Sequence, residues 1–297
     1  MSRRSLVVAA GLLAAAGITE SRAVDLSSYT ADFESLTATS PTALNDWKVF
    51  GIVYEDWGTY LYGYGTFPAP NNGAAFCQVT SGEGGPAQGN QGLVIYSDYN
   101  NVDHANTDNM VEALTFQETT VTEADLGPRV FRFDAKKGNL VSPSTALAFV
   151  KVIDPANGYA LVTSATLDTS DLPVEWGTYS IPFEIESYMV GMLIQFGFSA
   201  TAAGYEASGV FYDNVFFGVE TPAPPVISSI VKSGSVVSVT FPTEEGATYD
   251  LLKSVDGMQS FEPVASQPTI DGDGETQVAE DDAATEPSAF YKIMRTK

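Results

Sequence analysis

Alternation of hydrophobic and polar residues predicts β-strands along most of the chain. Glycine, proline, asparagine and aspartate separate the alternating runs at the spacing of an antiparallel sandwich. No stretch beyond the first 23 residues shows sustained helical periodicity. The pattern therefore predicts an all-β protein whose large domain is an antiparallel jelly-roll β-sandwich. Its clearest strands are residues 130–135, 146–153, 159–167, 179–185, 192–199 and 209–218.

A proline-rich segment at residues 221–225 (T-P-A-P-P) marks a domain boundary, because such a sequence forms a stiff, extended linker. We predict a jelly-roll domain over residues 24–220 and a small β-domain over residues 226–297. The small domain has short strand signals at residues 236–241, 248–253, 277–280 and 289–294. Its segments T-Y-D-L-L-K-S-V-D-G and A-F-Y-K-I resemble immunoglobulin-like and fibronectin type III-like modules appended to bacterial secreted proteins, which implies a small immunoglobulin-like β-sandwich.

Residues 1–23 have the pattern of a removable signal peptide. Arg3 and Arg4 precede an apolar run at residues 6–17, which is too short to span a bilayer, and Ser21 and Ala23 fit a cleavage site after residue 23. The arginine pair fits either the general secretory route or the twin-arginine route. We expect a protein secreted to the periplasm or the exterior, and no later segment is apolar enough to span a membrane.

The charge of the chain excludes two classes of partner. Removal of the leader leaves 11 basic and 36 acidic residues, a formal charge of −25, with no lysine or arginine between Lys48 and Arg129. Such a surface repels nucleic acid and anionic lipid. It suits neutral ligands and cations.

Residues for catalysis are scarce. The chain has one histidine, His104, and one cysteine, Cys77, which lies in an apolar segment and is expected to be buried and unreactive. Glu123 and Asp125 begin like the E-x-D-x-x-E strand of jelly-roll glycoside hydrolases, but Pro128 replaces the third carboxylate. We therefore expect a binding protein rather than an enzyme, although a carboxylate pair of a glycoside hydrolase or polysaccharide lyase stays open as an alternative.

The two ends of the large domain carry a family resemblance. Residues 32–36 read D-F-E-S-L and residues 210–215 read V-F-Y-D-N-V. Both segments resemble the galactose-binding-like jelly roll of carbohydrate-binding modules. The resemblance implies that the first and last strands pair, that the ligand is a glycan or polysaccharide, and that Glu34 and Asp213 hold a structural calcium ion completed by backbone carbonyls. A pair of solvated carboxylates at a sheet edge is the alternative.

An aromatic segment is the predicted ligand platform. Tyr60, Tyr62 and Tyr64 alternate with small residues and would share one face of a strand, with Trp57 close before them. Flat rings stack on the C–H faces of sugars, and nearby polar side chains bond the hydroxyls. The polar candidates are Asp98, Tyr99, Asn100, Asn101 and Gln117. Core packing of these rings is the competing interpretation.

Three functions remain open. The leading prediction is a non-catalytic protein that binds a neutral or weakly charged glycan. The alternatives are an adhesive or structural protein with a protein partner, and a jelly-roll glycoside hydrolase or lyase. Two polar loops, residues 100–109 around His104 and residues 271–275, could bind a cation but are predicted to be turns.

Overall fold

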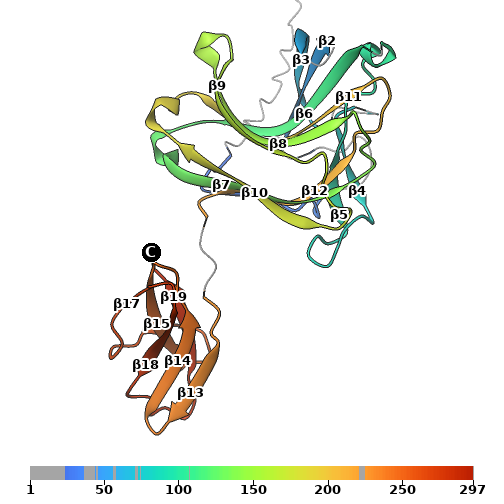
Figure 1. Ribbon diagram of the computed structural model, residues 1–297. Coiled ribbons are helices and arrows are strands. Elements are labelled where there is room, and N and C mark those ends of the chain that lie inside the picture. Colours follow the sequence, from blue (N-terminus) through green and yellow to red (C-terminus); the bar gives the residue numbers. More distant parts are fainter. Residues whose placement is uncertain are drawn as a thin grey trace, which may run out of the picture. The chain divides into compact units, whose positions relative to one another are not determined.

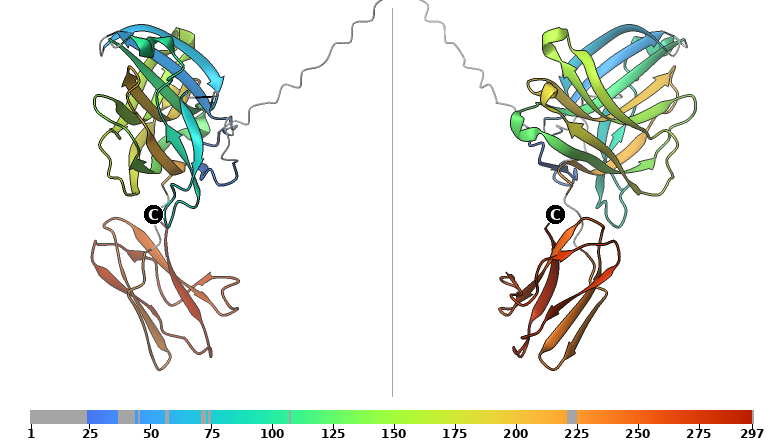
Figure 2. Two further views of the ribbon diagram at one scale, coloured as in Figure 1. Left: turned by 90° about the vertical axis from the view of Figure 1, so that its right-hand side faces the viewer. Right: turned by 60° about the vertical axis from the view of Figure 1, so that its left-hand side comes forward.

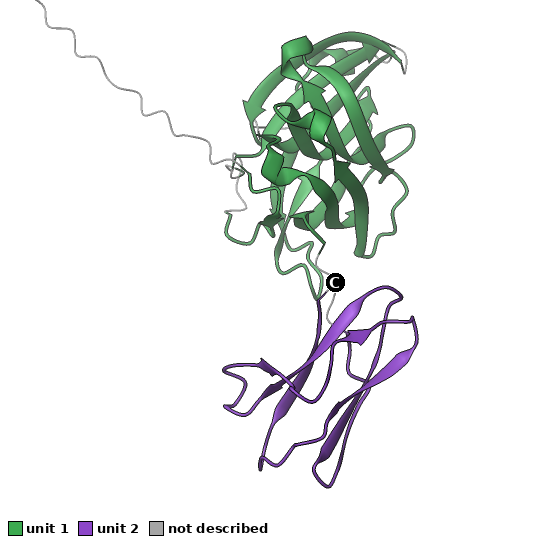
Figure 3. Ribbon diagram, turned by 90° about the vertical axis from the view of Figure 1, so that its left-hand side faces the viewer, with its two compact units in different colours: residues 1–220 green, residues 221–297 purple. Residues whose placement is uncertain are grey.

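The computed structural model describes residues 24–36, 44, 46–55, 58–70, 73, 75–106, 108–220 and 225–296. The chain divides into two compact units, residues 1–220 and 221–297 (Figure 3). Each unit has a hydrophobic core of its own. The two units are therefore described separately.

The first unit is an antiparallel jelly-roll β-sandwich of two sheets (Figure 1). One sheet has the strand order β10-β7-β12-β5-β4, and β1 pairs with β12 at its side. Its strands are β1 (Ser28–Ala31), β4 (Cys77–Ser81), β5 (Gln91–Ile95), β7 (Gly127–Lys137), β10 (Gly177–Ile185) and β12 (Val210–Gly218). The other sheet has the order β3-β2-β6-β11-β8-β9. Its strands are β2 (Lys48–Glu55), β3 (Thr59–Pro68), β6 (Asn109–Thr120), β8 (Thr145–Asp154), β9 (Ala160–Asp168) and β11 (Leu193–Ala203).

Aromatic rings fill the space between the two sheets. Phe131 and Phe133 of β7 meet Phe198 of β11, and the Phe198 ring stacks on Tyr212 of β12 with their centroids 3.7 Å apart. All four side chains are fully buried. Burial of each ring is worth about 1.5–3 kcal/mol relative to an exposed ring. These contacts join strands far apart in sequence and hold one sheet against the other.

The predicted fold class and the predicted pairing of the first and last strands are confirmed. β1 pairs antiparallel with β12 from Ser28 opposite Gly218 to Ala31 opposite Val215. The D-F-E segment does not form the first strand, however. Asp32, Phe33 and Glu34 follow β1, and the positive φ of Phe33 (59°) turns the chain away from the sheet.

The described residues of the second unit, 225–296, form seven short strands. One sheet has the order β13-β14-β18, formed by Ser229–Ser233, Val236–Pro242 and Thr276–Asp281. The other has β15 (Thr248–Ser254) paired with β16 (Glu262–Pro263), β17 (Ile270–Asp271) and β19 (Phe290–Arg295). Phe241 and Tyr249 meet edge to face in the core between them. The immunoglobulin-like assignment of this unit stays a prediction.

Helical structure in the described part of the chain is limited to four 3-10 turns: η1 (Val102–Ala105), η2 (Glu123–Asp125), η3 (Pro155–Asn157) and η4 (Ser187–Met189). Among the described residues, no helix has the length and apolar character needed to cross a membrane. The predicted signal peptide, residues 1–23, lies outside the described residues.

Independent folding of the first unit is the first testable prediction. A chain that ends at Glu220 is expected to unfold cooperatively with the same midpoint as the first unit of the full chain, because the two cores share no residue. Thermal unfolding followed by calorimetry measures this midpoint. Aggregation of the shortened chain would contradict the division into two independent units.

Candidate functional site

The hairpin of β2 and β3 carries the predicted aromatic platform at one edge of its sheet. Tyr64 lies opposite Gly51 and Tyr62 lies opposite Val53, but a bulge at Leu61 places Tyr60 opposite Tyr54. Paired residues point to the same side of a sheet, whereas neighbours along a strand point to opposite sides. Tyr60 therefore points to the outer side with Tyr54, and the predicted single face of three tyrosines is wrong.

Tyr62 and Tyr64 lie together with the predicted polar residues that follow β5. Their ring centroids are 6.0 Å apart. The Tyr64 hydroxyl donates to Asp98 Oδ2 at 2.7 Å, and the Tyr62 hydroxyl bonds the carboxylate of Asp103 and, at 3.4 Å, Asn101 Oδ1. Desolvation by burial raises the pKa of Tyr64. The predicted platform residues therefore lie together in the structure. Their hydroxyl and carboxylate groups already form hydrogen bonds with one another.

The glycines of this hairpin accommodate the protein's own rings. A Cβ atom on Gly51 would lie 2.2 Å from the Tyr64 ring, and one on Gly63 would lie 2.7 Å from the Phe50 ring. Phe50 therefore lies against β3 on the outer side, and Tyr64 lies against β2 on the inner side. Neither glycine therefore leaves open space for a flat ligand.

Tyr99 and Asn100 belong to a bonded turn after β5. The Tyr99 hydroxyl bonds Ser208 Oγ and donates to the Glu206 carbonyl, both at 2.6 Å, and its ring lies 5.0 Å from the buried ring of His104. The Asn100 amide donates to Asp98 Oδ1. Desolvation by burial lowers the pKa of His104, whose Nε2 lies 3.0 Å from Ser97 Oγ. The turn predicted within residues 100–109 is confirmed, because residues 102–105 form η1.

Gln117, another of the predicted ligand residues, does not reach the surface. Gln117 is 1% exposed and points between the sheets, where its Nε2 donates to the Tyr29 hydroxyl at 3.0 Å. Its prediction as a ligand contact is wrong, because its side chain is part of the core. Trp57 lies outside the described residues. Cys77 is buried as expected, and desolvation raises its pKa to about 12, which keeps the thiol protonated.

The outer face of the β3-β2-β6-β11-β8-β9 sheet carries residues that the sequence reasoning did not select. We call it the β6 face. The two edge strands, β9 and β3, rise on either side of β8 and β6, so the face is concave (Figures 1 and 2). Six strands about 4.8 Å apart give it a width of roughly 24 Å. An apolar strip of five clustered residues crosses it: Phe50, Ile52, Leu114, Phe116 and Phe149.

A glycine lies in the floor of the apolar strip. Phe116, Gly197 and Phe149 lie opposite one another on β6, β11 and β8, and the two phenylalanine rings are 6.5 Å apart. Lys151 Nζ lies 4.9 Å above the Phe149 ring, and desolvation lowers the pKa of this lysine. Phe116 and Phe149 are buried, whereas Phe50 and Ile52 are half-buried and accessible.

Polar rows border the strip on both sides. On one side Glu118, Gln195 and Lys151 lie in register across β6, β11 and β8, and Lys48 bonds Glu118 at 2.7 Å. On the other side Glu112 accepts a hydrogen bond of 3.1 Å from the half-buried Tyr54 hydroxyl. An apolar strip with polar side chains on both sides matches a ligand that has flat apolar faces and a polar rim.

The carboxylate of Glu34 holds the loop that precedes β5. Its Oε1 accepts hydrogen bonds of 2.7 Å from the amides of Asn90 and Gln91. The side chain of Gln91 donates in return to the carbonyl oxygens of Phe33, Glu34 and Leu36. The predicted metal residue therefore lies where the chain after β1 meets this loop.

Asp213 is the second predicted metal residue and is 1% exposed. Its Oδ1 accepts from the Asn214 amide, whereas its Oδ2 is buried without a hydrogen-bond partner among the described residues. Desolvation raises the pKa of Asp213 from 3.8 to about 7, and the negative charges of Glu34, Asp134 and Asp32 raise it further. Glu34 and Asp213 thus belong to one acidic cluster, but no three histidine, cysteine, aspartate or glutamate side chains among the described residues are grouped so that they could hold a metal ion.

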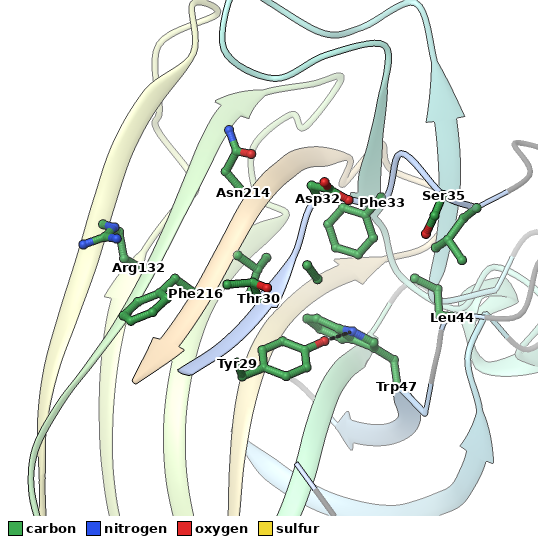
Figure 4. A pocket seen from close by; sticks show the side chains of 13 residues that line it. Tyr29, Thr30, Asp32, Phe33, Ser35, Leu44, Trp47, Arg132, Asn214 and Phe216 are labelled. Atoms are coloured by element: carbon green, nitrogen blue, oxygen red, sulfur yellow. Dashed lines mark hydrogen bonds between the residues drawn. The ribbon is translucent and has the colours of Figure 1, made fainter. Parts of the chain in front are cut away.

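A pocket of about 420 Å³ lies where β1 joins β12 (Figure 4). Tyr29 and Trp47 form one wall, joined by a 2.7 Å hydrogen bond from Trp47 Nε1 to the Tyr29 hydroxyl, and Asp32, Arg132 and Asn214 line its other side. Leu36 and Leu44 also line the pocket and flank residues 37–43, which lie outside the described residues.

Sequence comparison places the chain in no family. No family model matches it, and no curated protein matches it.

Comparison with solved structures gives matches of low similarity. The enzymatically active domain of bacteriophage CBA120 tailspike protein 4 matches with a TM-score of 0.35 and 14% identity, over 58% of this chain and 19% of that domain. The CBM22-2 xylan-binding domain from Paenibacillus barcinonensis Xyn10C matches with a TM-score of 0.34 and 15% identity, over 65% of this chain and 99% of that domain. The family 11 carbohydrate-binding module from Clostridium thermocellum, in complex with a β-1,3-1,4-mixed-linked tetrasaccharide, matches with a TM-score of 0.31 and 15% identity, over 64% of this chain and 95% of the module.

Proposed function

We propose that the first unit binds an extracellular carbohydrate without catalysis and that the β6 face is its binding surface. One observation carries this proposal: an apolar strip, accessible at Phe50 and Ile52, crosses the strands with hydrogen-bonding side chains on both sides. Each pyranose ring has an apolar C–H face and a rim of hydroxyls. Stacking on Phe50, Ile52 and Tyr54 buries the apolar face, and Glu112 and Glu118 bond the hydroxyls.

The width of the β6 face favours a chain of sugars over a single residue. An extended oligosaccharide that crosses β2 and β6 along the strip has polar side chains on both sides, namely Lys48 and Glu118 on one side and Tyr54 and Glu112 on the other. The tight ion pair of Lys48 with Glu118 and the hydrogen bond from Tyr54 to Glu112 orient these groups before the ligand arrives.

The spacing of the carboxylates on this face supports binding rather than hydrolysis. Glu112 and Glu118 lie six residues apart on β6, a separation of about 20 Å. Asp168 lies three strands from β6, about 14 Å away. A glycoside hydrolase needs two carboxyl groups about 5–10 Å apart.

We also propose a structural calcium ion at Glu34 and Asp213. The buried Oδ2 of Asp213 without a partner is the observation that supports a cation, because a buried carboxylate oxygen needs a donor or a metal. Asp213 and Glu34 would hold the ion with backbone carbonyl oxygens. When bound, the ion supplies positive charge that offsets the mutual repulsion of Asp213, Glu34 and Asp134, and it ties β12 to the segment that follows β1.

A glycan array followed by titration tests the binding proposal. We expect at least one neutral polysaccharide to bind, and we expect Tyr54→Ala to weaken that binding by about 1–3 kcal/mol, the range for an aromatic ring at a binding hot spot. Tyr188→Ala, at a half-exposed tyrosine of η4 outside the β6 face, is the matched control and should keep full affinity. Capture of a protein partner with no glycan bound would favour the adhesive alternative, and release of reducing or unsaturated sugar would favour an enzyme.

A further inference from the structure

The opposite side of the sandwich has a cavity of its own. It has a volume of about 1,000 Å³ and lies on the outer face of the β10-β7-β12-β5-β4 sheet, which we call the β12 face. This volume is at the upper end of the range for small-molecule sites, about 300–1,000 Å³. The β12 face belongs to the other sheet and shares no strand with the β6 face.

One row of paired residues forms the floor of this cavity. Gln78, Val94, Phe211 and Lys136 lie opposite one another on β4, β5, β12 and β7. Alternation along each strand then points all four side chains outward. The row combines an amide, an apolar side chain, an aromatic ring and a cation.

Two tyrosine rings border the floor of the cavity, and two backbones approach closely beside it. Tyr96 and Tyr99 border it with their rings stacked 6.2 Å apart, and Tyr96 is half-buried. A Cβ atom on Gly138 would lie 2.6 Å from the carbonyl oxygen of Gly209, so the two backbones approach closely there. Phe211 and Tyr96 offer aromatic faces on which a six-membered ring can stack.

The cavity holds positive charge in a strongly acidic unit. Residues 24–220 contain only six lysines and arginines against 24 acidic residues, and two of the six, Lys136 and Lys137, line this cavity. Lys136 Nζ lies over the Phe211 and Trp176 rings, at 5.1 and 5.2 Å, and its side chain is only 14% exposed. A cation fixed over aromatic rings marks the position at which an anion is favoured.

The bonds of both lysines leave room for a ligand. Lys136 Nζ has two acceptors among the described residues, the carbonyl and the carboxylate of Glu83 at 2.7 and 3.0 Å, and an ammonium has three N–H donors. Lys137 Nζ lies 3.5 Å from Asp171, whose side chain is fully exposed, so this pair is screened by water.

We propose that the β12 face is a second ligand site, which takes a carboxylate-bearing sugar, the residue type of a polyuronate. The sugar ring stacks on Phe211 or Tyr96, its hydroxyls bond Gln78 and Asn139, and its carboxylate accepts from Lys136. The two faces would then bind different glycans, a neutral one on the β6 face and an acidic one on the β12 face.

Titration calorimetry of the full chain with a linear tetramer of galacturonic acid tests this site. The comparison ligand is the same tetramer with each carboxylate reduced to a hydroxymethyl group. We expect the acidic tetramer to bind at least tenfold more tightly than the reduced one, and Lys136→Met to remove at least tenfold of that affinity. Lys232→Met, which removes the same charge from β13 of the second unit, should leave binding unchanged. Raising the salt from 50 to 500 mM should weaken binding, because the contact is between charges.

A second variant keeps the test decisive if Lys136→Met lowers stability. Glu83→Gln removes the carboxylate that competes for Lys136, and it should strengthen binding of the acidic tetramer severalfold. Equal affinity for both tetramers, or an acidic tetramer that binds Lys136→Met as well as the natural chain, would overturn the proposal.

Tyr54→Ala distinguishes this proposal from the proposed function. Loss of acidic-tetramer binding in Tyr54→Ala alone would move that ligand to the β6 face and overturn the second site. A different outcome is that the acidic tetramer binds in a Lys136-dependent way while no neutral glycan binds on the array. That outcome would support the second site and contradict the proposal that the β6 face binds a neutral glycan.

Discussion

Replacement of Trp47 by alanine is expected to lower the free energy of unfolding of the first unit by about 3–5 kcal/mol. Trp47 is 2% exposed and its ring is nearly parallel to that of Phe198, with their centroids 6.2 Å apart. Its Nε1 donates to the Tyr29 hydroxyl, which also accepts from Gln117. The substitution therefore leaves a cavity in the core and removes one bond of a buried hydrogen-bonded group.

Urea unfolding followed by circular dichroism measures this loss. Tyr29→Phe is the matched control, because it keeps the packing and removes only the hydroxyl that accepts both bonds, and it should cost about 1–3 kcal/mol. Trp47 does not lie on the β6 face, so the folded fraction of Trp47→Ala should bind glycan with unchanged affinity. A loss below about 1 kcal/mol would mean that Trp47 is not part of the core in solution.

The fold could be predicted because strand alternation is a local signal. The segments around Phe131, Phe198 and Tyr212 place one parity of residues inward, and that parity becomes the core. The orientation of Tyr60 could not be predicted in the same way. It depends on the bulge at Leu61, and a bulge is defined by pairing with another strand, which no short window of sequence contains.

The candidate site was missed in part because polarity is a poor guide to which way a strand residue points. Gln117 is polar yet shares the inward parity of Ala113 and Thr115, and its partner Tyr29 lies 88 residues away. Leu114 and Phe116 are apolar yet point outward. A signal was available in residues 111–117, where both parities contain apolar residues, because a strand with one solvated face would alternate.

The acidic cluster shows how a local motif and long-range contacts combine. The residues around Glu34 and Asp213 were recognisable from short motifs at the two ends of the domain. Their surroundings were not, because Gln91 and Asp134 reach the cluster only through the loop before β5 and the pairing of β7 with β12. Asp134 lies opposite Asp213 in that register, which places two carboxylates side by side.

Removal of calcium is expected to make the stability of the first unit depend on pH. The pKa of Asp213 in the metal-free folded chain is raised to about 7, whereas the unfolded chain has the ordinary value of 3.8. Between these values the folded state retains a proton that the unfolded state has lost, so the free energy of unfolding falls as the pH rises. Each pKa unit corresponds to about 1.4 kcal/mol, so the fall between about pH 4 and pH 7 is at most about 4 kcal/mol, with no further fall above pH 7.

Addition of calcium should reverse this loss, because the ion stabilises the ionised form of Asp213. At pH 8 and a hundredfold excess over the dissociation constant, we expect a gain of about 3 kcal/mol, measured by thermal unfolding with calcium and with a chelator. Asp213→Asn is the control. It keeps the shape of the side chain without a titrating group, so it should show neither the fall with pH nor the response to calcium. A natural chain that melts at the same temperature with calcium and with chelator would rule out the ion, and a fall with pH that persists in Asp213→Asn would assign that fall to another group.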